Sequence, residues 1–267
     1  MIALWGVLAA TAIAVLHSEL ALFSRVPRRA LRVLMYHRVA GAADRATVPA
    51  AVLERHIAWL RASGYALVRL SDVIRHVTDG APLPERPVLL TFDDGTADAH
   101  EVLLPLLRRL AAPAAVFVVP AFAGSARAYD GETRRFASAE QLRELAAAGV
   151  ELGLHTFEHR DLSRASPQEA AEDVARCVDW LRDAGVPFAP ALAYPYGAYP
   201  RKEPRARAAF VEALGRAGVR VAFRIGNRVN ALPLSAPLEL QRSEIRGDEP
   251  FWAFRWKVRR GRRKGFA

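Results

Sequence analysis

Residues 87–95 read Pro-Val-Leu-Leu-Thr-Phe-Asp-Asp-Gly, and this stretch decides the fold prediction. The apolar run at its start predicts a strand that is buried on both faces, as strands of a parallel sheet are. Two carboxylates, Asp93 and Asp94, follow where the strand ends, and Gly95 lets the backbone turn. In α/β folds, ligands and chemistry gather at the carboxyl ends of strands. The stretch therefore predicts a buried strand with a candidate site at its end.

Strand and helix patterns alternate on both sides of this stretch. Strands are expected at residues 31–36, 65–70, 88–92, 114–119, 150–154, 189–193 and 219–223, and helices at 51–62, 71–77, 97–110, 138–148, 166–185 and 205–217. Ser138 and Gln141 predict a capping box at the start of one helix. Repeated βα units predict an α/β fold with a mostly parallel sheet, whose closure into a barrel would need about seven or eight strands.

The composition limits the class of protein. The chain has 267 residues, of which 52% are apolar, so a large core is expected. The single cysteine, Cys177, excludes an intramolecular disulfide and a cysteine-based metal site. The formal net charge of +10 favours anionic partners. Nucleic acid is not expected among them, because no recognition motif accompanies the charge.

A second polar cluster predicts a metal site. His155 and His159 follow the strand expected at 150–154 and lie four residues apart, so on a helical turn they would share one face. Two imidazoles and one carboxylate, from Asp93 or Asp94, suit zinc, and also iron, cobalt or nickel. The other carboxylate could take a proton from the attacking water. The residues thus indicate a metal-dependent hydrolase.

Two further candidates follow predicted strands. His37 stands just past the first strand and is either a general acid or a structural histidine. Pro195 and Tyr196 lie in a loop that could present a backbone N–H to an oxyanion, or that simply forms a rigid turn.

Three motifs together resemble the polysaccharide deacetylase family, the NodB-homology group of carbohydrate esterase family four. They read Thr-Phe-Asp-Asp-Gly at 91–95, His-Thr-Phe-Glu-His at 155–159 and Ala-Tyr-Pro-Tyr-Gly at 193–197, and the resemblance covers roughly residues 31–247. The resemblance implies a distorted (β/α)7-type barrel and metal-dependent removal of N-acetyl groups from amino sugars.

The resemblance also implies a role for each matched residue. Asp93 would be the general base, and Asp94, His155 and His159 would bind the metal. The backbone N–H of Tyr196 would stabilise the oxyanion together with the metal, and Pro195 belongs to the same motif.

The chain departs from the family pattern in two places. No histidine follows His159, so the late Leu-x-His motif with the catalytic acid is absent. Residues 34–37 resemble the version in a circularly permuted subgroup, similar to poly-β-1,6-N-acetylglucosamine deacetylases, and this implies that His37 is the acid. The arginine that often orients the base is missing from the third motif. Arg242, past the strand-like residues 238–240, is a candidate substitute, and a surface ion pair is its alternative role.

Both ends of the chain differ from the expected catalytic domain at 31–247. Residues 1–24 are expected to form an apolar helix, either membrane-associated or packed on the domain. Residues 248–267 form an aromatic and basic segment, either an interfacial membrane anchor or a solvated tail. We therefore expect a membrane-associated or cell-envelope protein, with the side of the membrane open and the cytoplasmic face possible.

The predicted function is removal of N-acetyl groups from N-acetylglucosamine-type glycans of an exopolysaccharide or the cell envelope, with release of acetate. Two alternatives share the same residues. One is a non-catalytic glycan-binding protein on the same fold, and the other is a metal-dependent amidase acting on a different C–N bond. The glycan linkage, the native metal and the oligomeric state stay open.

Overall fold

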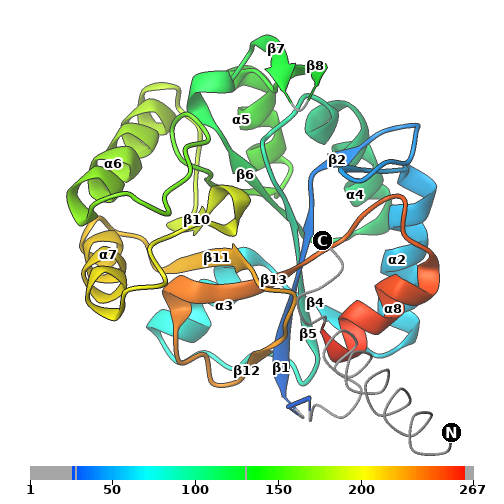
Figure 1. Ribbon diagram of the computed structural model, residues 1–267. Helices are drawn as coiled ribbons and strands as arrows, with labels where there is room; N and C mark the ends of the chain where they lie inside the picture. Colours follow the sequence, from blue (N-terminus) through cyan, green and yellow to red (C-terminus); the bar gives the residue numbers. More distant parts are fainter. Residues whose placement is uncertain (1–25, 28, 130, 262–267) are drawn as a thin grey trace, which may run out of the picture.

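The computed structural model describes residues 26–27, 29–129 and 131–261, and within these residues seven parallel strands close into a barrel (Figure 1). Around the barrel the strands are β1 (Ala30–Tyr36), β13 (Leu240–Glu244), β11 (Val221–Ile225), β10 (Ala191–Ala193), β9 (Glu151–Leu154), β6 (Ala115–Val118) and β5 (Pro87–Phe92). Pairing of β1 with β5, from Arg32 opposite Val88 to Tyr36 opposite Phe92, closes the ring. The predicted (β/α)7-type barrel is confirmed.

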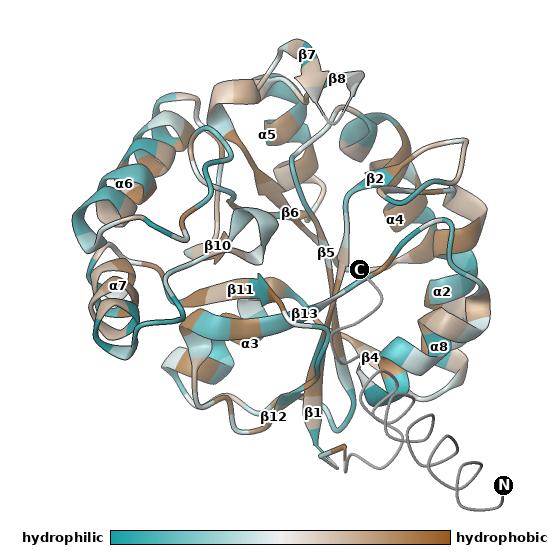
Figure 2. Cartoon of the chain, viewed as in Figure 1, coloured by the Kyte–Doolittle hydropathy of each residue, from teal (hydrophilic) through white to brown (hydrophobic). Residues whose placement is uncertain are grey.

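Helices surround the barrel on the outside (Figure 1). They are α2 (Ala50–Ala62), α3 (Leu70–Thr78), α4 (Leu104–Leu110), α5 (Ala139–Ala147), α6 (Pro167–Asp183), α7 (Pro204–Arg216) and α8 (Phe251–Arg260). The capping box of Ser138 and Gln141 is present at the start of α5. Figure 2 shows hydrophobic residues along the barrel strands and hydrophilic residues on the outer side of helices such as α6.

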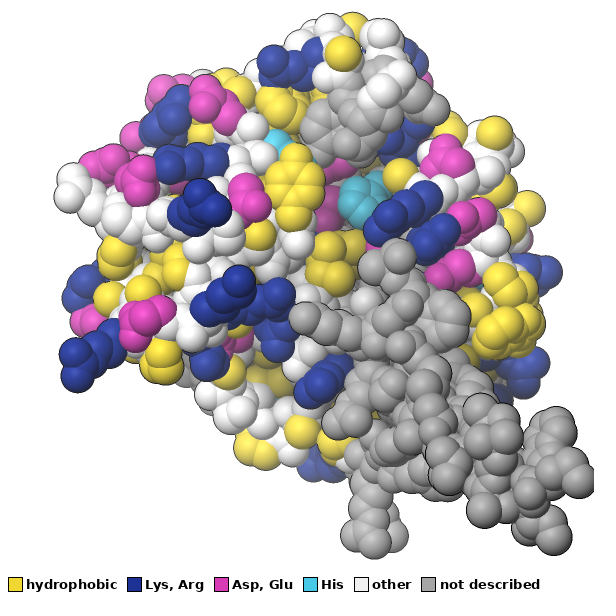
Figure 3. All heavy atoms as spheres, viewed as in Figure 1, with side chains coloured by type: hydrophobic (Ala, Val, Ile, Leu, Met, Phe, Trp, Pro, Cys, Tyr) yellow, Lys and Arg dark blue, Asp and Glu magenta, His cyan; other side chains and the backbone are white. Residues whose placement is uncertain are grey.

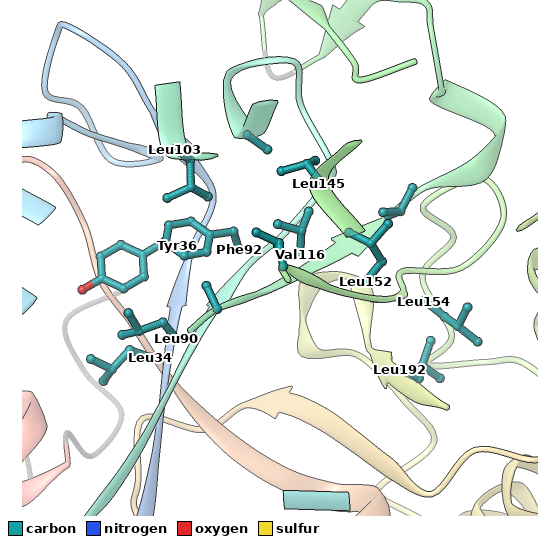
Figure 4. Packing of buried hydrophobic residues seen from close by; sticks show 14 of the residues in the cluster. Leu34, Tyr36, Leu90, Phe92, Leu103, Val116, Leu145, Leu152, Leu154 and Leu192 are labelled. Carbon is teal, nitrogen blue, oxygen red and sulfur yellow. The ribbon is translucent and has the colours of Figure 1, made fainter. Parts of the chain in front are cut away.

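Alternation along the strands separates the core into two apolar clusters. Leu90 and Phe92 of β5 belong to the larger cluster, which lies between the barrel and its helices (Figure 4). Leu89 points the other way and belongs to a second cluster with Phe117 and Phe223, whose ring centroids are 5.6 Å apart. The apolar filling of the barrel therefore leaves polar chemistry to the carboxyl ends of the strands.

Several expected elements have different bounds in the structure. The strand expected at 65–70 is only β4 (Ala66–Leu67), because α3 already begins at Leu70, where the carboxylate of Glu151 accepts the backbone N–H of Leu70 at 2.6 Å. The helix expected at 97–110 opens with a π-helical turn, η1 (Ala99–Leu103), in front of Pro105. Residues 237–239 form the short turn η4 (Pro237–Glu239), and the strand β13 follows that turn.

Short strand pairs outside the barrel escaped prediction from the sequence. β2 (Arg38–Val39) pairs with β3 (Thr47–Val48), and the hairpin of β7 (Ala126–Tyr129) and β8 (Glu132–Arg135) stands beside α5 (Figure 1). The last such strand, β12 (Asn230–Ala231), runs antiparallel to β1. These segments are two to four residues long, which is too short for a clear alternating pattern.

The segment expected as a C-terminal tail contains the helix α8, which packs on the domain. Phe254 and Val258 are buried, and the ring of Phe254 stacks on His56 of α2 with centroids 3.7 Å apart. The ammonium group of Lys257 donates to the carboxylate of Glu249 at 2.6 Å and to the backbone oxygen of Glu244 at 2.6 Å. Residues 251–260 are therefore part of the fold, not a solvated extension.

The predicted apolar helix at 1–24 and the last basic residues, 262–267, lie outside the described part of the chain. Among the residues that the structure does describe, no helix combines the length and the apolar character that a membrane span requires.

The buried His56 makes the stability depend on pH. Burial lowers the pKa of His56 to about 3, and the charges of Arg55 and Lys257 act in the same direction. The native state thus keeps this imidazole neutral, whereas the unfolded chain protonates it below a pH of about 6.5. The contribution of the neutral His56 to stability is fully present above that pH, and it is lost progressively as the pH falls toward 3.

We expect the free energy of unfolding to fall by about 2 kcal/mol when the pH is lowered from 7 to 5, because His56 takes up a proton only in the unfolded chain. Urea unfolding of the wild type and of His56→Gln at both pH values measures this contribution. The glutamine variant should show a pH-dependent loss that is smaller by about that amount. Equal losses in the two proteins would show that His56 does not control this dependence.

Candidate metal centre

The polar residues singled out in the sequence gather at the carboxyl end of the barrel. Asp93 and Asp94 follow β5, and His155 and His159 follow β9. Figure 3 faces this end of the barrel, and histidine and acidic side chains are visible in a hollow near the centre of the surface. The strand ends thus bring together groups that are about 60 residues apart in the chain.

Asp94, His155 and His159 could hold a metal ion. One donor atom from each lies within 4.8 Å of the others. Oδ1 of Asp94 is 3.5 Å from Nε2 of His155 and 3.5 Å from Nε2 of His159. A tetrahedral zinc ion with ligands at about 2.0–2.1 Å separates its ligand atoms by about 3.3–3.4 Å. The donor types and their spacing therefore fit a divalent ion, with one coordination position left for water or substrate.

Contacts behind the two imidazoles orient them. Nδ1 of His155 lies 2.7 Å from the backbone oxygen of Ala193, to which it donates. Nδ1 of His159 lies 3.1 Å from the hydroxyl of Tyr196. Both contacts leave Nε2 directed at Asp94, as hydrogen bonds behind metal-binding histidines commonly do.

The spacing of His155 and His159 would place them on one face of a helical turn, but in the structure the two residues do not lie on a helix. They lie in the loop between β9 and α6, and Thr156 and His159 both have a φ of 58°. The hydroxyl of Thr156 accepts the backbone N–H of Arg160 at 2.8 Å, and Asp173 of α6 accepts that of Phe157 at 3.0 Å. Left-handed backbone is costly for these residue types, so the surrounding contacts must hold it in place.

Arg242 forms a buried ion pair with Asp93. Its Nη1 and Nη2 donate to Oδ1 and Oδ2 of Asp93 at 2.6 and 2.7 Å, and the arginine side chain is 0% exposed. The alternative role considered for Arg242, a surface ion pair, is therefore wrong. Residue 242 lies within β13, and its guanidinium lies 5.6 Å from the ring centroid of Phe117, a residue of the second apolar cluster.

The ion pair keeps Asp93 ionised. Burial alone would raise the pKa of Asp93, but the charges of Arg242 and His155 outweigh it and lower the pKa below its ordinary value. Burial also acts to raise the pKa of Asp94, but its contact with His155 and the charge of His37 outweigh burial and lower that pKa below its ordinary value. Both carboxylates are thus charged at neutral pH.

The two imidazoles respond differently to the same surroundings. Burial acts to lower the pKa of His155, but Asp93 and Asp94 outweigh it and raise the pKa. Burial and the neighbouring His155 lower the pKa of His159 to about 4. His159 is therefore neutral at pH 7, which is the form that binds a metal ion.

His37, Pro195 and Tyr196 lie at the same end of the barrel. His37 is half-buried just after β1, and its charge acts on both Asp93 and Asp94. Tyr196 is 64% exposed with a φ of 57°, and Pro195 is buried. Gly197 holds this loop against β11, since a Cβ at this position would lie 2.5 Å from the backbone nitrogen of Ile225.

Sequence reasoning missed Thr91 as part of this network. Its buried hydroxyl donates to the backbone oxygen of Leu34 at 2.9 Å, and Nη1 of Arg242 lies 3.4 Å from the same hydroxyl. A threonine in an otherwise apolar buried strand was the available signal, because a buried hydroxyl requires a partner.

The family follows from comparison with known proteins. The sequence model described as Polysaccharide deacetylase matches residues 80–219, just over half of the chain. The chain belongs to the polysaccharide deacetylase family. The matched range includes both carboxylates, both histidines and the Pro195–Gly197 turn.

Curated relatives and a solved structure agree with this membership in the polysaccharide deacetylase family. The chain is 32% identical over 142 residues to the poly-β-1,6-N-acetyl-D-glucosamine N-deacetylase of Escherichia coli, covering 49% of this chain and 21% of that protein. It is 26% identical over 150 residues to the enzyme of that name from Staphylococcus epidermidis, covering 53% and 50%. The chain thus spans half or less of these relatives. IcaB from Ammonifex degensii superposes with a TM-score of 0.72 at 27% identity, covering 88% of this chain and 100% of that one.

The contact between Tyr196 and His159 predicts an effect on metal affinity. Tyr196→Phe removes the hydroxyl beside Nδ1 of His159, so the imidazole loses its orientation. We expect the dissociation constant for zinc to rise about tenfold, as for other residues behind a metal ligand. Competition with a chromogenic chelator measures it.

Tyr65→Phe is the matched control, because Tyr65 lies after α2 and contacts Arg86. Its zinc affinity should equal that of the wild type. If Tyr196→Phe also binds zinc like the wild type, the hydroxyl has no part in orienting His159.

Proposed function

We propose that this protein is a metal-dependent N-deacetylase that hydrolyses the acetamide of N-acetylglucosamine units in an exopolysaccharide or cell-envelope glycan, releasing acetate. One observation carries the proposal: a group of side chains that could bind a metal ion, Asp94, His155 and His159, lies next to an ionised carboxylate. That carboxylate belongs to Asp93 and is held by Arg242. Curated relatives named for poly-β-1,6-N-acetyl-D-glucosamine support the substrate class.

Asp94, His155 and His159 would hold the ion, and zinc suits this donor set best, with iron, cobalt or nickel as alternatives. Once bound, the ion supplies Lewis acidity to the acetamide carbonyl and to the attacking water. The three residues provide one carboxylate oxygen and two nitrogens, which leaves room for the substrate.

Asp93 would act as the general base. It is ionised, and Oδ2 lies 3.8 Å from Nε2 of His155, so it borders the metal-binding group without replacing Asp94 in it. Arg242 occupies one side of the carboxylate and fixes its plane. A base held in this way accepts a proton from water that approaches the carbonyl carbon.

The remaining steps fall to the loops after β1 and β10. We assign the backbone N–H of Tyr196 to the developing oxyanion, with Pro195 restricting the loop in front of it. His37 would donate a proton to the leaving amine, since it lies near both carboxylates at the open end of the barrel. A glycan substrate of this class would place the protein at the cell envelope.

Two other functions would use the same fold. A non-catalytic glycan-binding protein has no use for an ionised carboxylate held beside a metal-binding group, which favours an enzyme. An amidase acting on another C–N bond would need the same site, and only the substrate separates it from a deacetylase.

Acetate release from β-1,6-linked N-acetylglucosamine oligomers tests the reaction. We expect release by the purified protein, its loss after treatment with a chelator, and recovery when zinc is added. His37→Gln should lower kcat by about 100-fold or more on these amides, because it removes the proton donor to the amine. The loss should be much smaller on an aryl acetate, whose leaving group departs without a proton.

His76→Gln is the control, since His76 lies on α3 and contacts the backbone oxygen of Ala81. Activity that survives thorough removal of metal would contradict the metal-dependent reaction. An equal loss on amide and aryl ester would remove His37 from the role of acid. Hydrolysis of another amide in preference to every acetylated glycan would favour the amidase.

A further inference from the structure

Helices α2 and α8 form a surface of tryptophan and arginine on the side of the barrel. We define this Trp–Arg surface by Trp59 of α2 and by Trp252, Arg255, Trp256, Arg259 and Arg260 of α8. It contains three of the five tryptophans in the chain. In Figure 3, hydrophobic and basic side chains lie together at the right-hand edge, where Figure 1 shows α2 and α8.

The inner face of α8 anchors the helix, so the outer face is presented in a fixed orientation. Phe254 and Val258 are buried, and Lys257 is tied to Glu249. Trp252, in contrast, is 64% exposed. With the half-buried Trp59 and Trp256, it gives α2 and α8 three partly exposed tryptophans, and apolar side chains grouped on a surface in this way mark an interaction site.

Arginines accompany the aromatic rings of this surface. The guanidinium carbons of Arg255 and Arg259 lie 5.8 and 5.4 Å from the ring centroid of Trp59, and that of Arg260 lies 5.8 Å from the ring of Trp256. Each guanidinium thus lies beside an indole ring. At a boundary between water and a less polar phase, the ring could enter the less polar side while the cation stays on the side of the water.

The nearby carboxylates are already engaged. Glu54 of α2 accepts two hydrogen bonds from Arg109 at 2.8 Å, and Glu249 accepts from Lys257. Their charges are matched elsewhere, so the Trp–Arg surface carries net positive charge. A partner that complements it presents both anionic groups and an apolar layer beneath them.

We propose that the Trp–Arg surface docks on an anionic phospholipid bilayer. Tryptophan is enriched at the level of the headgroups, and arginine pairs with lipid phosphate while its stem covers apolar surface. A soluble polyanion would engage the arginines but would give Trp252 no apolar environment. The helix would lie in the plane of the interface, as interfacial amphipathic helices do.

This docking leaves the catalytic end of the barrel accessible. α8 lies on the flank of the barrel, whereas the hollow with the histidines faces along the barrel axis (Figures 1 and 3). The inference goes beyond the proposed function, because it concerns where the protein sits relative to a membrane.

Sedimentation with vesicles tests the proposal on the full chain. Vesicles of phosphatidylcholine with one quarter phosphatidylglycerol are compared with vesicles of phosphatidylcholine alone. The triple variant R255Q/R259Q/R260Q should bind the anionic vesicles at least about tenfold more weakly than the wild type. Trp252→Ser should weaken binding several-fold, and its effect should persist at high salt, whereas that of the arginines should fade.

The control triple variant R201Q/R205Q/R220Q removes the same charge from exposed positions before, in and after α7. It should bind the vesicles like the wild type. Equal binding by wild type and R255Q/R259Q/R260Q, or an equal loss in the control, would overturn the proposal. Binding to heparin without binding to vesicles would also overturn it, in favour of a soluble polyanion. Acetate release from soluble oligomers should be the same in all these variants, so that failure of docking and failure of the proposed reaction are distinguishable.

Discussion

A buried ion pair between Arg242 and Asp93 is the constraint on which the candidate site depends. It lies where the apolar filling of the barrel ends, and it joins β13 to the end of β5. Removing two charges from water is costly, and only near-ideal bidentate geometry offsets that cost. Loss of either partner would leave an uncompensated buried charge, at a cost of about 3–5 kcal/mol.

The ion pair also explains how two adjacent aspartates take different positions. Asp93 directly follows the strand, where its backbone N–H donates to the backbone oxygen of Tyr36, and its carboxylate is held by Arg242. Asp94 has a φ of 74° and faces the two histidines. In extended backbone, neighbouring side chains point to opposite sides, so the left-handed residue is what brings both carboxylates to one hollow. Thr156, His159 and Tyr196 have similar backbone, and strain of this kind is typical of functional sites.

Local patterns predicted most of the barrel and part of the site. Apolar runs and caps located the main strands and helices, and position after a strand located Asp93, Asp94, His155 and His159 at one end. The burial of Arg242 depends on contacts with residues about 150 positions away, and the polar run Leu-Gln-Arg-Ser-Glu of β13 gave little sign of a barrel strand. The packing of α8 on His56 and Trp59 is equally long-range, so residues 248–260 looked like a tail.

The central claim is that Asp94 belongs to the metal and Asp93 to the attacking water. Zinc affinity measured for Asp93→Asn and Asp94→Asn tests it most directly. The account predicts that Asp93→Asn binds one zinc ion with an affinity within about tenfold of the wild type, because Asp93 contributes no ligand atom. It predicts that Asp94→Asn loses tight zinc binding. Loss of zinc in Asp93→Asn with retention in Asp94→Asn would contradict the division of roles between the two carboxylates.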